Sequence, residues 1–258
     1  MEIAYAISGF VVGFIVGVTG VGGGSLMTPI LVLGFGIHPA TAVGTDLLYA
    51  SITKSAGIWV HSKRGNVNWK IVGWLSAGSL PAALICVVLL RWMDIGSTRA
   101  AGVITVSLGV ALLLTAVALL FKEPLSRWSG KGVKPESWRM RNVCGLTIAT
   151  GAVMGVLVTL SSVGAGAIGV TALLLLFPLA ASARIVGTDI AHAVPLTAVA
   201  GLGHLTMGSV DLALLGSLLV GSLPGIYLGS HVGSRLPERY LRPALATLLV
   251  VIGGKLVW

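Results

Sequence analysis

Long runs without a charged residue constrain this chain more than any other feature of its sequence. They cover residues 3–37, 71–90, 100–121, 142–183 and 212–234. A helix needs about 20 apolar residues to cross a bilayer, and each of these runs is long enough. Only 10% of the residues are charged, against about 25% in a soluble domain. The sequence therefore predicts an all-α, polytopic membrane protein, whereas a β-barrel would show short alternating segments.

The positive charges and the cysteines exclude several classes of function. The formal net charge is +9, but most of the basic residues flank apolar runs, where they orient helices and contact lipid headgroups. We therefore expect the lipid bilayer, and no nucleic acid, as a partner. Cys86 and Cys144 are far apart in sequence, and no cluster of His, Cys and carboxylate residues has metal-ligand spacing. Nucleotide-binding and nucleophile motifs are absent too, so we expect neither an enzyme nor a cofactor.

A glycine-rich stretch, Gly20-Val21-Gly22-Gly23-Gly24, interrupts the first apolar run. Each glycine costs a helix about 1 kcal/mol relative to alanine, so this stretch should break the helix. In hydrocarbon the break would leave backbone groups unpaired, at several kcal/mol each. It is therefore either buried in protein, facing a polar cavity, or a loop between two helices at the membrane surface.

The chain repeats itself with an offset of 143 residues. Val43-Gly44-Thr45-Asp46 then falls on Val186-Gly187-Thr188-Asp189, and Gly78-Ser79-Leu80-Pro81 falls on Gly221-Ser222-Leu223-Pro224. With an offset of 142, the glycine break recurs at residues 163–166. We predict a first transmembrane repeat (1–121), a basic cytoplasmic loop (122–141) and a second transmembrane repeat (142–258). Interrupted helices at corresponding positions of two repeats are typical of a transporter's binding site.

The basic loops bear on whether the halves are parallel or inverted. Residues 62–70, 122–141 and 231–242 are rich in Lys and Arg, which favours a cytoplasmic location for all three loops. If each broken segment crosses the membrane once, the halves are parallel and the last of these loops lies outside. If each turns back, the halves are inverted and all three loops lie inside. The charges favour inversion. Polar turns also mark helix starts, with Asn68 and Asp211 as expected N-caps.

Two half-helices that begin at the breaks would direct free backbone N–H groups and positive dipole ends into the protein. Such a pair predicts an anion site near the bilayer midplane, with nearby hydroxyls as further donors. The alternative is that the glycines only permit close helix packing. The predicted substrate-binding residues are Thr19, Gly22, Gly23, Gly24, Ser25, Ser161, Ser162, Gly164, Ala165 and Gly166.

Asp46 and Asp189 are the main ionisable candidates, because an acid inside a membrane helix is costly and marks function by default. Either they exchange protons as the coupling ion of a transport cycle, or they brace the broken backbone by accepting its N–H groups. Lys54, Arg184 and His192 are candidate countercharges; they could equally be packing or interfacial residues.

These motifs, in this order and in duplicate, resemble the TauE/SafE family of membrane permeases. The match includes residues 20–24, 42–46 and 65–69 of the first half and 162–166, 186–189 and 208–211 of the second, over nearly the whole chain. The resemblance implies secondary transport, in the export direction, of a small anion such as sulfite, sulfoacetate or another sulfonate across a bacterial or archaeal cell membrane. Ala165 departs from the glycine of the first half. An anion channel, or a membrane partner that delivers a sulfur compound to an enzyme, is the alternative.

Overall fold

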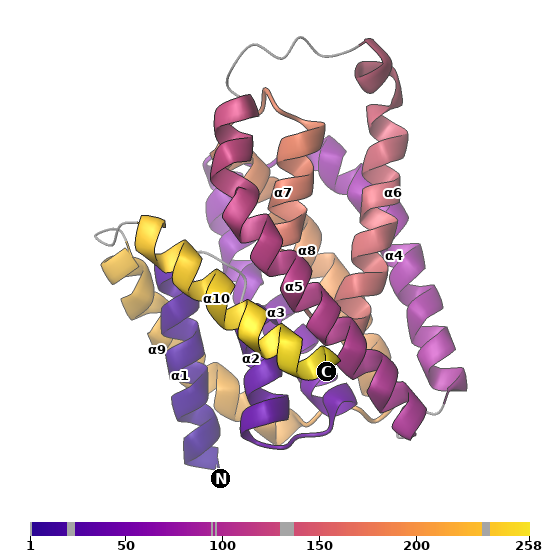
Figure 1. The fold of residues 1–258 in the computed structure, drawn as a ribbon, viewed down its shortest axis with the longest axis vertical. Helices are drawn as coiled ribbons and strands as arrows, with labels where there is room; N and C mark the ends of the chain where they lie inside the picture. The colour runs from indigo at the N-terminus through magenta and orange to yellow at the C-terminus, as the bar shows by residue number, and fades with distance from the viewer. Residues whose placement is uncertain (1, 20–23, 94, 96, 130–136, 234–237) are drawn as a thin grey trace.

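The computed structural model describes the chain except residues 1, 20–23, 94, 96, 130–136 and 234–237 (Figure 1). The described residues form helices and no strands, as the apolar runs predict. The elements are α1 (Glu2–Thr19), α2 (Gly24–Pro29), the π-helix η1 (Ile30–Gly34), α3 (Pro39–Lys63), α4 (Trp69–Trp92), α5 (Thr98–Ser129), α6 (Ser137–Ser161), α7 (Ala167–Leu176), α8 (Ser182–Thr206), α9 (Leu212–Gly233) and α10 (Glu238–Val257).

Two half-length apolar helices stand among longer ones. Among the described residues, segments of α4, α5, α6, α8 and α9 are long and apolar enough to cross a membrane. The apolar segments Ser25–Gly34 and Ala167–Leu176 hold only ten residues each, or about 15 Å of helix, half of a bilayer's hydrocarbon thickness. The prediction of an all-α, polytopic membrane protein is confirmed, and each short helix follows one of the two breaks.

Both short segments turn back toward the start of the helix before them. The ring of Phe35, just after η1, lies 5.0 Å from the ring of Tyr5 near the start of α1. In the second half, Gly169 of α7 lies beside Met154 of α6, and the connection from α7 to α8 lies at the same end of the molecule as the start of α6 (Figure 1). Neither broken segment therefore crosses the molecule in one direction.

Glycines bring helices of different halves into close contact. α1 packs against α9, and α4 packs against α6. A side chain at Gly221 would collide with the backbone carbonyl of Ala6, and one at Gly78 would collide with that of Ile148. Small residues are what let membrane helices approach this closely. The first helix of each half is thus held by the fourth helix of the other.

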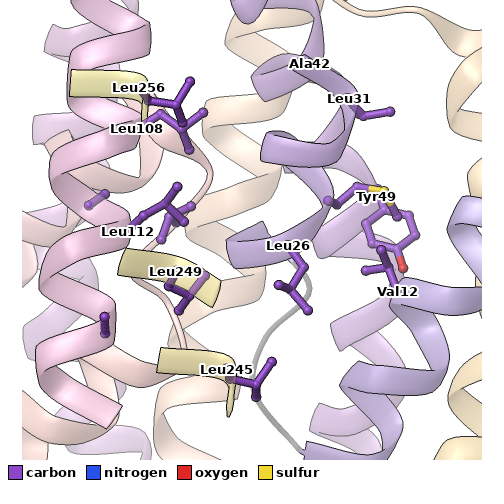
Figure 2. Close-up of a cluster of buried hydrophobic side chains, with 14 of the residues drawn as sticks. Val12, Leu26, Leu31, Ala42, Tyr49, Leu108, Leu112, Leu245, Leu249 and Leu256 are labelled. Atoms are coloured by element: carbon purple, nitrogen blue, oxygen red, sulfur yellow. The ribbon is translucent and has the colours of Figure 1, made fainter. Parts of the chain in front are cut away.

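Two further helix pairs run in opposite directions, as their neighbouring residues show. α3 lies against α8, and α5 lies against α10. In Figure 2, Leu256 near the end of α10 lies beside Leu108 of α5, and Leu245 lies at the opposite end of the same cluster. This buried cluster also holds Leu26, next to the first break, and Tyr49 of α3. It packs the short α2–η1 segment against the crossing pair α5–α10.

Element starts follow the repeat of the sequence. α2 and α7 start at residues 24 and 167, α3 and α8 at 39 and 182, and α4 and α9 at 69 and 212. The opposite directions of α3 and α8, and of α5 and α10 (Figure 1), favour inverted over parallel halves. The repeat boundaries and the inversion stay predictions.

Two helix starts lie where the sequence predicts them, whereas the loop between α5 and α6 is shorter than predicted. The Asn68 side chain accepts from the Ile71 amide at 3.4 Å, and Asp211 accepts from the amides of Ala213 and Leu214 at 2.9 Å, so both predicted N-caps are confirmed. The predicted polar loop 122–141 is shorter, because α5 continues to Ser129 and α6 begins at Ser137.

Candidate functional site

The second break is a short stretch of left-handed backbone. α6 ends at Ser161, and α7 begins at Ala167. Between them, φ is 58° at Ser162, 122° at Gly164 and 127° at Gly166. Glycine adopts such angles at little cost, whereas serine does so rarely. The glycines therefore let the chain reverse within five residues, and Ser162 is held there by its surroundings.

The two serines of this break have different contacts. The Ser161 hydroxyl donates to the Leu157 carbonyl at 2.6 Å and accepts from the Val163 amide at 3.1 Å, so it is used by the backbone around it. The Ser162 hydroxyl is buried and has no hydrogen-bond partner within the described parts of the chain. Unlike Ser161, Ser162 is not used by the backbone of the break, and its hydroxyl faces the Asp46 carboxylate.

The first break is described only at its edges. Gly22 and Gly23 lie outside the described residues; α1 ends at Thr19, and α2 starts at Gly24. Ser25, in the first turn of α2, is 6% exposed. Of the predicted contribution of this break to an anion site, the structure describes only the start of α2.

Each of the two acids lies against the short helix of its own half. Asp46 Oδ2 accepts a 2.5 Å hydrogen bond from the Thr28 hydroxyl of α2. Asp189 lies over the first turn of α7, where a side chain at Gly169 would collide with its carboxylate oxygen. Both acids are fully buried, at 0% and 1% exposure. Asp46 is thus bonded to a side chain of α2, and Asp189 lies against the first turn of α7, whereas the bracing of the broken backbone stays a prediction.

Lys54 connects the two halves of the site. It lies on α3, two turns after Asp46, and its ammonium donates to the Ala165 carbonyl of the second break at 3.2 Å. It is attracted electrostatically to both Asp189 and Asp46. The equivalent position in the second half is Thr197, whose hydroxyl donates to the Ala193 carbonyl of its own helix. The cation is therefore supplied by one half only.

His192 follows Asp189 by one turn and is also buried. Its Nε2 lies 2.8 Å from the Ser79 hydroxyl of α4, and its Nδ1 has no partner among the described residues. Tyr49 occupies the equivalent position after Asp46 and interacts with Ser222, the equivalent of Ser79. In the described parts of the chain, no group of three His, Cys, Asp or Glu residues is placed to hold a metal ion.

The structure does not bring Arg184 to this cluster. Its side chain is exposed, and it lines a small surface pocket with Asn68, Phe177 and Thr188, where α4 and α8 begin and α7 ends. Arg184 therefore lies near the surface end of α7, whereas Lys54 lies at its inner end.

The Gly-Thr pair before each acid makes a contact that sequence reasoning missed. The Thr188 hydroxyl accepts from the Asn68 amide at 3.0 Å, and the Thr45 hydroxyl accepts from the Asp211 amide at 3.1 Å. Thr45 and Thr188 are equivalent in the repeat, as are Asn68 and Asp211. The shared offset was a signal that could have paired them. Each threonine thus links its own half to the start of a helix in the other half. The acid that follows each threonine lies buried in the protein interior.

We expect this contact to contribute to stability. In Thr188→Val, the half-buried Asn68 amide loses its acceptor, which should lower the free energy of unfolding by about 1 kcal/mol and lower the thermal unfolding midpoint in detergent. Thr105→Val is the control, because that hydroxyl donates only to the Ala101 carbonyl of its own helix. Equal losses in both variants would contradict a specific role for the contact.

Comparison with known proteins agrees with this architecture. The model of the sulfite exporter TauE/SafE family matches residues 5–256. The probable membrane transporter protein YjnA of Bacillus subtilis is 39% identical over 260 residues, covering 100% of both chains. The probable membrane transporter protein YdhB of the same organism is 28% identical over 215 residues, covering 80% of each chain. No solved structure matches the chain. The chain belongs to the TauE/SafE family of membrane transporters.

Proposed function

We propose that this transporter is a secondary carrier for a small organic or sulfur-containing anion. Sulfite, sulfoacetate and other sulfonates are the substrates that the family description and the motif resemblance suggest. A sulfonate presents three acceptor oxygens and one negative charge. It suits backbone amides at a helix start together with one hydroxyl and one cation.

The observation that carries the proposal is the meeting of three features at the start of α7. The half-length helix begins inside the protein, the buried Ser162 hydroxyl has no partner among the described residues, and the Lys54 ammonium lies at Ala165. The start of α2 holds the equivalent position in the first half. We propose that the anion binds between these two helix starts, near the bilayer midplane of a multi-pass protein in the cell membrane.

Export is the direction that the motif resemblance suggests. Two buried acids beside one lysine favour a carrier coupled to another ion over a channel, because an open anion pore would expose its permeant ion to both carboxylates. Electrical recording separates the two, since a channel gives a current that follows voltage, whereas a carrier gives saturable counterflow.

Binding to the purified protein tests the proposal. Sulfite, sulfoacetate, thiosulfate and a panel of carboxylates are compared by thermal shift and by counterflow in proteoliposomes. We expect at least one sulfur oxyanion to bind, and Ser162→Ala to weaken it about tenfold through the loss of one hydrogen bond to a charged group. Ser217→Ala is the control, because that exposed hydroxyl donates to the Ala213 carbonyl of α9. Failure of the whole panel would contradict the proposal.

A further inference from the structure

His192 is a buried histidine that uses only one of its two ring nitrogens. Its side chain is fully buried on α8, and its Nε2 lies 2.8 Å from the Ser79 hydroxyl of α4. Its Nδ1 is buried and has no hydrogen-bond partner in the described parts of the chain. His204 of the same helix is equally buried, but its two nitrogens lie 3.1 Å from the Ser209 hydroxyl and the Thr159 carbonyl. Buried polar atoms without a partner are rare in native proteins, so Nδ1 of His192 calls for an explanation.

The Ser79 hydroxyl indicates which nitrogen of His192 carries the proton. Several buried hydroxyls of these helices donate to a carbonyl one turn earlier in their own helix, as those of Thr115 and Thr159 do. Ser79 is fully buried and makes no such bond among the described residues, where His192 Nε2 is its one partner. The hydroxyl therefore donates to Nε2, because its hydrogen would otherwise have no acceptor. An imidazole that accepts at Nε2 is neutral and carries its proton at Nδ1, so the unpaired atom is an N–H donor.

His192 lies at the depth of Lys54 in the facing helix α3. Two contacts join these antiparallel helices on either side of this depth: the Ser51 hydroxyl donates to the Val194 carbonyl at 3.5 Å, and a side chain at Gly57 would lie 3.3 Å from that of Ile190. Lys54 and His192 are each midway between these contacts in sequence, and the ring interacts electrostatically with the ammonium. Asp189, which neighbours His192 on the surface of α8, lies against the first turn of α7. The Nδ1–H group thus belongs to the cluster around the start of α7.

We propose that His192 binds the transported anion through Nδ1–H, as a neutral donor beside the ammonium of Lys54. The inference rests on the proposed function and names a residue that selects the substrate. In this role His192 is a hydrogen-bond donor and not a countercharge. Ser79 is a positioning residue, because its hydroxyl occupies Nε2 and thereby keeps the proton on the nitrogen that meets the anion.

The donor set favours a sulfonate over a carboxylate. All three oxygens of a sulfonate are acceptors, so the Lys54 ammonium, the His192 N–H and the backbone at the start of α7 can each bind one of them. A carboxylate has two oxygens and leaves one of these donors without its own acceptor. We therefore expect sulfoacetate to bind more tightly than malonate, which has a second carboxylate in place of the sulfonate.

Two substitutions at His192 separate its nitrogens. The side-chain nitrogen of Asn is as many bonds from Cα as Nδ1, and that of Gln is as many bonds from Cα as Nε2. His192→Asn therefore keeps an N–H donor for the anion, whereas His192→Gln keeps the contact with Ser79 and lacks the donor. We expect His192→Gln to weaken sulfoacetate binding by about 10–100-fold, as the loss of one hydrogen bond to a charged group predicts. His192→Asn should keep most of the affinity and the preference over malonate, and His192→Gln should lose that preference. Titration calorimetry of the purified protein measures both ligands.

The wild-type protein gives a second measurement that does not depend on how well one variant folds. Nitrogen-15 NMR of the histidine-labelled protein shows which ring nitrogen is protonated, and the His192 signals are those that disappear in either variant. We expect the proton on Nδ1 and a shift of the Nδ1 signal when sulfoacetate is added. Ser79→Ala should weaken binding, because it leaves Nε2 open to the proton. Ser222→Ala is its control at the equivalent position of the second half, where the hydroxyl donates to the Leu219 carbonyl of its own helix.

The outcomes separate this inference from the proposed function. Wild-type affinity in His192→Gln, or an equal loss in both variants, would overturn the assignment. Loss in His192→Asn alone would assign His192 to the fold through Ser79. A proton on Nε2, or an Nδ1 signal that sulfoacetate does not shift, would overturn the assignment as well. In each of these cases sulfoacetate still binds to the wild-type protein, and the anion carrier stands. A wild-type protein that binds no anion of the panel would contradict both.

Discussion

Lys54→Met should lower anion affinity and transport by at least about 100-fold, equivalent to about 2.8 kcal/mol. The ammonium of Lys54 reaches the Ala165 carbonyl at the start of the second short helix, and the second half has threonine at the equivalent position. The substitution therefore removes the positive charge from the proposed site. The dissociation constant of sulfoacetate and the rate of counterflow measure the effect.

A loss of binding could also come from damage to the fold, because Lys54→Met removes the donor to the Ala165 carbonyl and a positive charge that attracts the buried Asp189. Removing the charge that offsets a buried carboxylate destabilises the fold. The double variant Lys54→Met/Asp189→Asn removes both charges and should recover most of the stability without recovering binding. Lys63→Met is the surface control, since that ammonium lies 3.8 Å from the Trp59 ring centroid at the end of the same helix. Recovery of binding in the double variant would show that Lys54 serves the fold only.

Gly221→Val should have the largest effect on stability, about 3 kcal/mol or more, and reduce the yield of monodisperse protein. Any side chain here meets the Ala6 carbonyl and the Phe10 amide nitrogen of α1, which are backbone atoms that cannot rotate away. Overfilling a tight contact costs about 1–3 kcal/mol, and more where the backbone itself has to move.

Gly216→Val in the same helix is the control for this prediction. A side chain at Gly216 would meet no atom within 4 Å, and the residue is exposed. It tests the cost of a β-branched residue in the helix, without a change in packing. Similar thermal unfolding midpoints for the two variants would mean that the contact between α1 and α9 is not what makes glycine necessary at position 221.

Much of the architecture could be predicted from the sequence, because the membrane leaves few choices for the backbone. Uncharged runs require helices, and four glycines in residues 20–24 require a break. The pairing of α1 with α9 could not be predicted in the same way. Most faces of these helices are apolar, and lipid covers an apolar face as well as protein does. Glycines such as Gly221 and Gly225 permit a close partner but do not say which helix it is.

The two acids of the candidate site could be predicted from the sequence, but the residues that contact them were harder to predict. Asp46 and Asp189 stand out because charge is rare in such runs, but Thr28, which binds Asp46, belongs to no motif and looks like any other hydroxyl in the sequence. Arg184 stood out for the same reason as Lys54, yet it is exposed. Charge alone does not say at which depth a residue lies, and residues 20–23 fall outside the described structure.

The packing of α1 against α9 bears on the order in which the protein assembles, because the two helices lie far apart in the sequence. The glycine face of α1 that receives α9 begins near Ala6, and its partner backbone begins near Gly221. At about 5–20 residues per second, a ribosome needs roughly 10–40 s to synthesise the chain between them. During that time α1 has no α9 to pack against. The first half thus cannot complete its own packing before the second half is inserted, and synthesis of the whole chain precedes assembly of either half.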